Sequence, residues 1–223
     1  MCGRFGLALS GDALAELLEV EPPTEALAPR YNIAPSQSVL ALRQAPSGRE
    51  VVNLQWGLVP FWARDRKIAY KLINARSETV AEKGAFKHAF AQRRCAVPAD
   101  GFYEWKPEGK LKQPYHMGLA DGAGFLMAGL WERWSDRETG EVLETCTLLT
   151  TEANPKLAAV HHRMPVILPP AHREAWLDPG QPLPPDIFAP YPADRMVMWP
   201  VSPIVNHANR DEPACRMRQE RLL

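Results

Sequence analysis

The chain has 223 residues, 46% of them hydrophobic, and its 26 basic and 26 acidic residues give a formal net charge of zero. This length fits a single domain over residues 1–223, and because there is neither an apolar run of about 18 residues nor a signal-peptide pattern, we expect a cytoplasmic protein without a membrane span. The neutral total excludes a protein that binds nucleic acid through a uniformly basic surface.

Secondary structure follows from hydrophobic periodicity, capping residues and the positions of glycine and proline. In chain order the pattern predicts a helix over 12–19, a strand over 51–59, a short helix capped by Ser77, a helix over 86–93, strands over 95–97, 102–105, 115–119, 125–131 and 143–151, a short helix over 154–160, a strand over 164–168, a helix over 171–177 and a strand over 196–199.

These strands do not alternate regularly with long helices, so a doubly wound parallel sheet is not expected. We predict an α+β fold with a mostly antiparallel, curved, barrel-like β-sheet and short peripheral helices. The segment 178–192 is rich in proline and glycine, and we expect it to form a surface loop within the domain.

The four cysteines, Cys2, Cys95, Cys146 and Cys215, form no CxxC pair. A reducing compartment argues against disulfides. The sequence also shows no metal-ligand cluster and no phosphate-binding glycine loop, so we predict no metal and no cofactor. Cys95 and Cys146 lie in apolar, strand-like runs and are expected in the core.

Positive charge is concentrated in one stretch of the neutral chain. Between Phe61 and Arg94 there are nine basic residues and three acidic ones. A local basic surface of this kind attracts phosphate even when the total charge is zero. On charge alone, a solvated charged face is the simpler interpretation.

The N-terminus carries the most distinctive chemistry. The chain begins Met1-Cys2-Gly3-Arg4, and methionine before a small residue is commonly removed. Removal leaves an amine and a thiol on adjacent carbons of Cys2, both with a usable deprotonated fraction near neutral pH. The thiol then suits acyl transfer, or the amine and the thiol together suit trapping of an aldehyde as a five-membered thiazolidine. A second-position cysteine without any role is the plain alternative.

Five further segments contain residues suited to binding or catalysis, at 31–35, 56–62, 74–79, 102–105 and 161–165. Glu104 lies among aromatic residues, an environment that raises the pKa of a carboxyl toward the range of a general acid. Each segment also has a structural interpretation. Tryptophans beside a turn are commonly core residues, and paired histidines such as His161 and His162 are commonly on the surface.

Together these segments resemble the SRAP family, the SOS-response-associated peptidases that act as abasic-site processing proteins. The resemblance covers nearly the whole chain and rests on MCGRF at 1–5, YNIAPSQ at 31–37, WGLVPFW at 56–62, NARSET at 74–79, PADGFYEW at 98–105, HHRMPVIL at 161–168 and VSPIVN at 201–206. The family's histidine motif resembles His-x-Arg-Met-Pro, so the catalytic role falls to His161. The SRAP fold is the implied architecture.

The resemblance implies a covalent mechanism. Autocatalytic, peptidase-type hydrolysis removes Met1, the amine of Cys2 attacks the C1′ aldehyde of a ring-opened abasic sugar, and the thiol closes a thiazolidine. The resulting DNA–protein crosslink shields the lesion. Asn74 would orient the amine, Glu104 would act as acid and base near the sugar, and His161 would move protons at the Schiff base. Whether the protein also cleaves abasic DNA as a lyase stays open from the sequence.

The same resemblance implies a role in DNA repair within the SOS response, with single-stranded DNA that contains an abasic site as the partner. The protein would then be on the nucleoid when it is crosslinked, and no protein partner is implied. The DNA-binding residues implied are Arg4, Arg76 and Arg163 on phosphates, Trp62 and Tyr70 stacked on bases, and Asn32 and Pro35 shaping the bent strand.

Two other functions stay open from the sequence. One is an N-terminal-nucleophile amidohydrolase of the glutamine amidotransferase kind, which also begins Met-Cys-Gly and would use Cys2 to attack an amide. The other is a module that binds single-stranded DNA without covalent chemistry, through Trp62, Tyr70 and the arginines.

Overall fold

A computed structural model describes residues 2–22 and 27–219 of the chain. Its strands are β1 (Phe5–Leu7), β2 (Arg30–Ile33), β3 (Ser38–Ala45), β4 (Gly48–Trp56), β5 (Asn74–Arg76), β6 (Arg94–Ala99), β7 (Gly101–Glu108), β8 (Leu111–Leu119), β9 (Phe125–Ser135), β10 (Val142–Glu152), β11 (Arg163–Pro165), β12 (Ile167–Leu168) and β13 (Met196–Pro200). Its α-helices are α1 (Gly11–Leu18), α2 (Lys87–Gln92) and α3 (Pro170–Leu177), and its 3₁₀ turns are η1 (Arg66–Lys71), η2 (Ser77–Thr79), η3 (Leu157–Ala159), η4 (Ala193–Arg195), η5 (Pro203–Asn206) and η6 (Pro213–Cys215).

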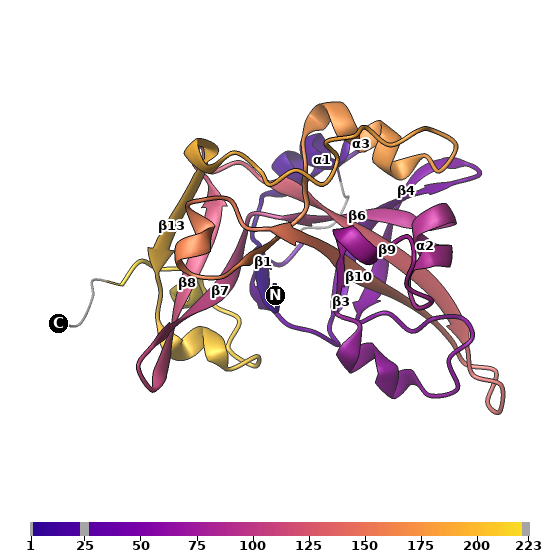
Figure 1. Cartoon of the computed structure of the whole chain (residues 1–223), viewed down its shortest axis with the longest axis horizontal. Helices are drawn as coiled ribbons and strands as arrows, with labels where there is room; N and C mark the ends of the chain where they lie inside the picture. The colour runs from indigo at the N-terminus through magenta and orange to yellow at the C-terminus, as the bar shows by residue number, and fades with distance from the viewer. Residues whose placement is uncertain (1, 23–26, 220–223) are drawn as a thin grey trace.

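Five strands close into a barrel. Around the ring, β10 pairs with β4, β4 with β3, β3 with β6, β6 with β9, and β9 again with β10. The β10–β4 contact is parallel and the other four are antiparallel, with β5 added in parallel beside β10. The predicted α+β fold with a mostly antiparallel, barrel-like sheet is therefore confirmed (Figure 1).

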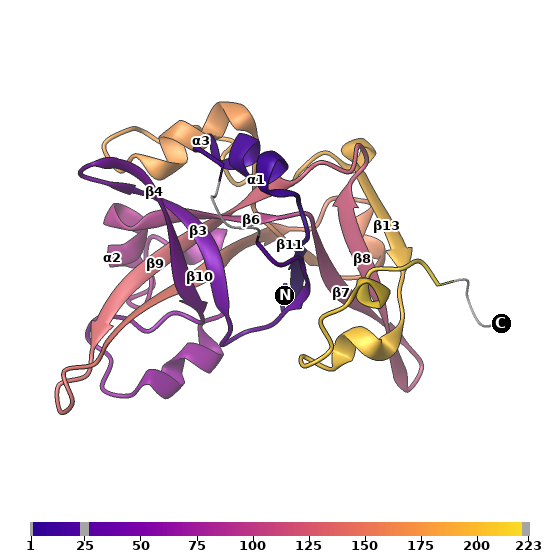
Figure 2. The same ribbon diagram turned by 180° about the vertical axis from the view of Figure 1, so that it is seen from behind.

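A second sheet of five strands stands beside the barrel, in the order β13-β8-β7-β1-β2. In Figures 1 and 2 the N-terminal end of the chain lies between this sheet and the barrel. Because β1 pairs with both β2 and β7, the residues just before it are held in the space between the two sheets. This arrangement places Cys2 in the interior.

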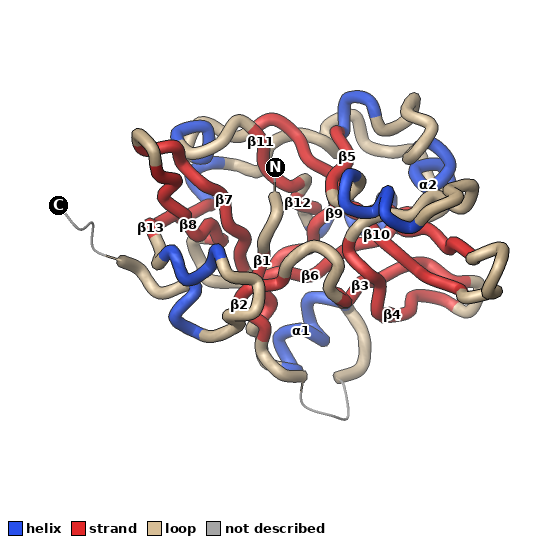
Figure 3. The backbone as a smooth tube through the Cα atoms, turned by 90° about the horizontal axis from the view of Figure 1, so that it is seen from below, coloured by secondary structure: helices blue, strands red, loops and turns tan. Residues whose placement is uncertain are grey.

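The core has two main parts that use opposite faces of the barrel strands. One cluster fills the barrel and the space beside it, and it includes Cys2, Phe5, Trp56, Phe102 and Leu148. The other lies outside the barrel, where α1, α2 and α3 pack on it through residues such as Leu14, Ala89 and Trp176. Figure 3 shows α1 and α2 outside the barrel strands. Period-two alternation along each strand divides its side chains between the two clusters.

Two glycines of the sequence motifs are required by close backbone approach. Gly57 directly follows β4 and has φ +125°, and a Cβ there would meet the backbone oxygen of Ala69 at 2.9 Å. Gly101 begins β7, where a Cβ would meet Nε2 of His116 at 2.1 Å. Only glycine readily adopts the positive φ found at position 57, and only glycine leaves room for the His116 ring at position 101.

Several predicted elements differ from the structure. Ser77 does not cap a helix, because it is itself the first residue of the short turn η2, whose N-cap residue is Arg76. The helix predicted over 154–160 shrinks to the 3₁₀ turn η3, in which the N–H of Val160 bonds to the oxygen of Leu157, three residues back. The strand predicted over 164–168 is split at Val166, whose backbone bonds to Leu149 and Ala128.

The strands β1, β2, β3 and β5 were not among the predicted elements. Of these, β1, β2 and β5 have only three or four residues each. Strands this short depend on their pairing partners more than on their own sequence pattern. The segment 178–192 is the expected loop, although its Ile187 is buried against the outer cluster. Within residues 2–22 and 27–219, every helix falls short of the length and apolarity needed to cross a bilayer.

Candidate active site and nucleic-acid interface

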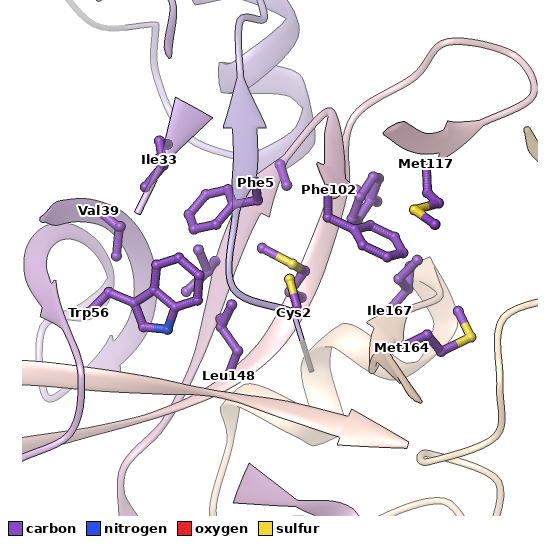
Figure 4. Close-up of a cluster of buried hydrophobic side chains, with 14 of the residues drawn as sticks. Cys2, Phe5, Ile33, Val39, Trp56, Phe102, Met117, Leu148, Met164 and Ile167 are labelled. Carbon is purple, nitrogen blue, oxygen red and sulfur yellow. The ribbon is translucent and has the colours of Figure 1, made fainter. Parts of the chain in front are cut away.

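Cys2 lies at the centre of the inner core cluster. Its side chain is fully buried, and Figure 4 shows it among Phe5, Phe102 and Leu148. The thiol lies 3.7 Å from the backbone oxygen of Arg4. Burial, assisted by the nearby charge of Glu104, raises the pKa of the Cys2 thiol. The thiol is therefore protonated at neutral pH. The predicted removal of Met1 concerns a residue outside the described part of the chain.

Asn74 holds the backbone of Cys2. It begins β5, which is fixed in register by its parallel pairing with β10. Its amide nitrogen donates to the carbonyl oxygen of Cys2 at 2.8 Å. Its amide oxygen is buried and accepts no hydrogen bond among the described residues. An unsatisfied buried acceptor is costly, so this oxygen is poised to accept a donor close to Cys2.

Glu104 and His161 face each other at a cavity. Glu104, on β7, is 3% exposed, and burial raises the pKa of its carboxyl. Its Oε1 lies 3.9 Å from Nδ1 of His161. Both residues line an open cavity of about 500 Å³. A carboxyl of raised pKa and a histidine that face each other are a suitable pair for proton transfer.

His161 is held by the strand that follows it. The backbone N–H of Arg163 donates to its Nδ1 at 3.0 Å, which places the proton of the neutral ring on Nε2. The ring stacks on that of His162, with centroids 4.4 Å apart. Burial lowers the pKa of His161, so the imidazole is neutral at physiological pH and able to accept a proton.

Replacement of Glu104 by glutamine is expected to stabilise the fold at neutral pH. Because the folded-state pKa of Glu104 is raised, the unfolded chain releases this proton at a lower pH. The free energy of unfolding therefore falls as the pH rises from the unfolded pKa through the folded one. Thermal unfolding at about pH 4 and about pH 8 checks this. The Tm of Glu104→Gln should exceed the Tm of the wild type at the higher pH. The difference between the two Tm values should be smaller at the lower pH. A lower Tm at the higher pH contradicts it.

Three residues of the cavity wall were missed by the sequence analysis, namely Trp105, Lys112 and Asn206. The indole of Trp105 donates to the side chain of Asn206 at 2.7 Å. Arg4 donates to the backbone oxygen of Asn206 at 3.4 Å and to that of Gly3 at 3.0 Å. Trp105 and Asn206 lie inside the motifs at 98–105 and 201–206. No sequence motif contains Lys112, which reaches the cavity because β8 pairs with β7 in a hairpin.

Arg163 is buried rather than exposed to a phosphate. Its guanidinium makes a bidentate ion pair with Glu78, at 2.5 and 2.9 Å, and donates to the backbone oxygen of Thr150 at 2.5 Å. These contacts tie β11 to β10 and to the turn η2. In this structure Arg163 supports the strand that positions His161.

Arg163→Lys is therefore expected to lower the free energy of unfolding by about 1–2 kcal/mol, because an ammonium cannot reproduce the bidentate geometry. Arg76 lies in β5, which pairs with β10 as β11 does, but its side chain is exposed, so Arg76→Lys is a matched control with little effect expected. Chemical denaturation of the two variants provides the measurement. Equal stability of both would argue against a supporting role for Arg163.

Asn32 is likewise buried. Its amide nitrogen donates to the backbone oxygens of Val205, His207 and Arg210, at 3.2, 3.0 and 2.7 Å. It thereby fixes the loop that carries Asn206 into the cavity wall, and its side chain does not reach the surface. Pro35, three residues along the chain, is partly exposed.

The aromatic residues expected to stack on bases are at the surface. Trp62 is 45% exposed and Tyr70 is 72% exposed. Of the nine basic residues between Phe61 and Arg94, seven are exposed. Arg93 instead pairs with the buried Glu132 at 2.9 Å, and Arg94 donates to the backbone oxygen of Asp178 at 2.7 Å. The exposed basic surface is therefore smaller than the sequence predicted.

Among the described residues no group of three or more His, Cys, Asp or Glu side chains is arranged to hold a metal ion. Cys95, Cys146 and Cys215 are buried free thiols, so the expectation that Cys95 and Cys146 are core residues is confirmed. These cysteines are separate from the Glu104–His161 cavity. Cys2 is the one cysteine in contact with the candidate catalytic residues.

Comparison with known proteins gives a consistent result. The family model described as "SOS response associated peptidase (SRAP)" matches residues 1–208. The chain is 43% identical to the abasic site processing protein YoaM of Bacillus subtilis, over 92% of this chain and 93% of that protein. It is 33% identical to the abasic site processing protein HMCES of Gallus gallus, over 84% of this chain and 65% of that protein. A crystal structure of a protein from Bacteroides thetaiotaomicron superposes with a TM-score of 0.84 at 27% identity, covering 98% of this chain and all of that one.

Proposed function

The chain belongs to the SRAP family, and from this premise we propose that it is an abasic-site processing protein that captures the lesion covalently through Cys2. The observation that carries the proposal is the meeting of Cys2 with Asn74, Glu104 and His161. Asn74 bonds to Cys2, Glu104 acts on the pKa of its thiol, and His161 lies against Glu104. Three separate parts of the chain thus converge on its second residue.

The proposed reaction uses the amine first. After hydrolysis of the Met1–Cys2 bond, the amine adds to the C1′ aldehyde of the open-chain abasic sugar and loses water to give an imine. The thiol then adds to the imine carbon while its proton passes to the nitrogen, closing a thiazolidine. The raised pKa of the thiol favours this order, because a protonated thiol is a poor initial nucleophile. The same property disfavours an amidohydrolase that attacks through the thiolate.

Each neighbour has a role in that sequence. The unsatisfied amide oxygen of Asn74 would accept a hydrogen bond from the new amine and so orient its lone pair. Glu104, with its raised pKa, would protonate the departing oxygen during ring opening and dehydration. His161 is neutral and would take up or return protons at the imine. The same acid and base would serve the hydrolysis of Met1.

The DNA strand would follow the exposed basic and aromatic surface. We assign phosphate contacts to Arg76 and to Arg4, and stacking to Trp62 and Tyr70, with Pro35 at the bend. Asn32 and Arg163 would act from the interior, by holding the cavity loop and β11. Unpaired bases are required for stacking of this kind, which supports a single-stranded substrate. Lyase activity, a role in the SOS response and residence on the nucleoid belong to the same proposal.

The test is an adduct that survives denaturation. The purified protein is mixed with a single-stranded oligonucleotide that carries one abasic site, and with the intact oligonucleotide of the same length. A band of reduced mobility is expected on a denaturing gel only with the abasic strand. Mass spectrometry of the free protein should find Cys2 as the first residue. Adduct formation by protein that still carries Met1 would overturn the proposal.

A further inference from the structure

The cavity between Glu104 and His161 is large enough for a free small molecule. Its volume is about 500 Å³, which is within the range of about 300–1,000 Å³ typical of sites for small organic ligands. The rest of its wall includes the cationic residue Lys112 and the amide residue Asn206. The cavity therefore combines space for a ligand with an acid–base pair on one side and polar partners on the other.

Arg4 lies against the wall of this cavity and has an unused donor. Its guanidinium donates to the backbone oxygen of Asn206 over a long distance, 3.4 Å. Its Nε is buried and donates no hydrogen bond within the described part of the chain. Burial lowers the pKa of Arg4, because the charged form loses hydration. An anion beside the guanidinium would offset that loss and satisfy the unused donor.

Arg4 and Cys2 are held at a fixed separation. The Cys2 thiol lies 3.7 Å from the backbone oxygen of Arg4, and the same oxygen accepts a hydrogen bond from the N–H of Tyr103 at 3.0 Å. Glu104 directly follows Tyr103 on β7. A ligand whose carbonyl reaches Cys2 can therefore place an anionic group near Arg4 when only a few bonds separate the two groups.

This arrangement recognises two groups that also occur outside DNA. A lesion without a base presents only an aldehyde and phosphates to the protein. In an abasic strand, the C1′ aldehyde is joined to the phosphorus on the 3′ side through two carbons and one oxygen. Glyceraldehyde 3-phosphate has the same connection between its aldehyde carbon and its phosphorus. A short aldose phosphate therefore presents the same pair of groups with the same spacing, and it is small enough for the cavity.

We propose that Cys2 also captures free aldose phosphates, with the phosphate held by Arg4 and Lys112. The inference rests on the proposed function, because it uses the same amine and thiol after loss of Met1. The amine adds to the aldehyde carbon and one water leaves, giving an imine. The thiol sulfur then bonds to that carbon while its proton passes to the nitrogen. The products are one thiazolidine and one water, and the step needs neither an oxidant nor a reductant. A captured sugar phosphate blocks Cys2 against abasic DNA.

The test compares glyceraldehyde 3-phosphate with glyceraldehyde, which lacks the phosphate. Protein without Met1 is incubated with each compound, and tandem mass spectrometry measures the second-order rate at which Cys2 gains the compound less one water. A peptide with the sequence of residues 2–5 gives the intrinsic ratio of the two rates. In the protein the phosphate should raise the rate by about 10- to 150-fold beyond that ratio, as charge-assisted hydrogen bonds do. Equal ratios in protein and peptide would overturn the inference.

Variants locate the phosphate. Arg4→Gln should bring the ratio of the two rates close to that of the peptide, and Lys112→Gln should lower it in part. A ratio measured on one variant is insensitive to altered chemistry at Cys2. Lys112 is exposed, so its variant tests the site even if Arg4→Gln does not fold. Arg137→Ala, at the exposed turn between β9 and β10, is the control and should keep the wild-type ratio. A wild-type ratio in both Arg4→Gln and Lys112→Gln would overturn the assignment.

Competition with DNA separates this inference from the proposed function. Preincubation with glyceraldehyde 3-phosphate should lower the later yield of adduct with abasic single-stranded DNA, and glyceraldehyde at equal concentration should lower it less. An adduct with abasic DNA but no effect of phosphate on capture would overturn the inference alone. Phosphate-dependent capture at Cys2 without any DNA adduct would support the inference while the crosslinking proposal fails. Reaction with neither substrate would overturn both.

Discussion

Cys2→Ala is expected to lose the denaturation-resistant adduct completely. The variant retains an amine at its first residue once Met1 is removed, so it still forms an imine with the abasic aldehyde. It lacks the sulfur that closes the ring, and an imine hydrolyses readily. A denaturing gel should therefore show no adduct with Cys2→Ala, and addition of borohydride, which reduces the imine, should restore one. These two results would assign imine formation to the amine of the first residue and the stability of the adduct under denaturation to the thiol.

The matched control for that experiment is Cys215→Ala. Cys215 is a buried free thiol, as Cys2 is, but it packs with Val201 and Val205 in a separate cluster. Its removal should leave the adduct intact. A stable adduct with Cys2→Ala in the absence of borohydride would contradict the mechanism, because a side chain elsewhere would then be the nucleophile. Mass spectrometry must establish that both variants have lost Met1.

Glu104→Gln is expected to slow adduct formation by about 10²–10⁴-fold, the usual contribution of a general acid or base. Burial raises the pKa of Glu104, so the wild-type rate should decline as the pH rises through that pKa and the acid loses its proton. Glutamine cannot titrate, and its rate should lack this decline. The measurement is the rate of adduct formation against pH, with protein from which Met1 has been removed.

The stability of the same variant serves as the control for the kinetics. Because Glu104→Gln should be more stable than the wild type at neutral pH, a loss of rate cannot be attributed to unfolding. Glu152→Gln is a second control, since that carboxylate is exposed at the end of β10. An unchanged rate or an unchanged pH profile in Glu104→Gln would remove Glu104 from the chemistry and leave His161 as the remaining acid–base group.

Much of this protein could be inferred from local patterns. The long strands β9 and β10 were located because their hydrophobic runs are long and free of proline, and the helix α1 because Ser10 caps it and its apolar residues recur with helical spacing. The reactive group was also evident, since only the first residue of a mature chain has an amine beside its thiol. These features depend on covalent structure or on neighbours within a few residues.

Only the tertiary structure decided which residues meet. Asn32 and Arg163 belong to motifs that suggested DNA contacts, yet both are buried, because one holds the loop of Asn206 and the other pairs with Glu78. No local pattern marked Lys112, which lies in one cavity wall with Glu104 and His161 only because distant segments meet there. The sequence by itself was enough to propose the chemistry of Cys2, because that chemistry needs only the amine and the thiol of one residue. The closure of the barrel decided its surroundings, because contacts between distant segments depend on strand pairing that no local pattern encodes.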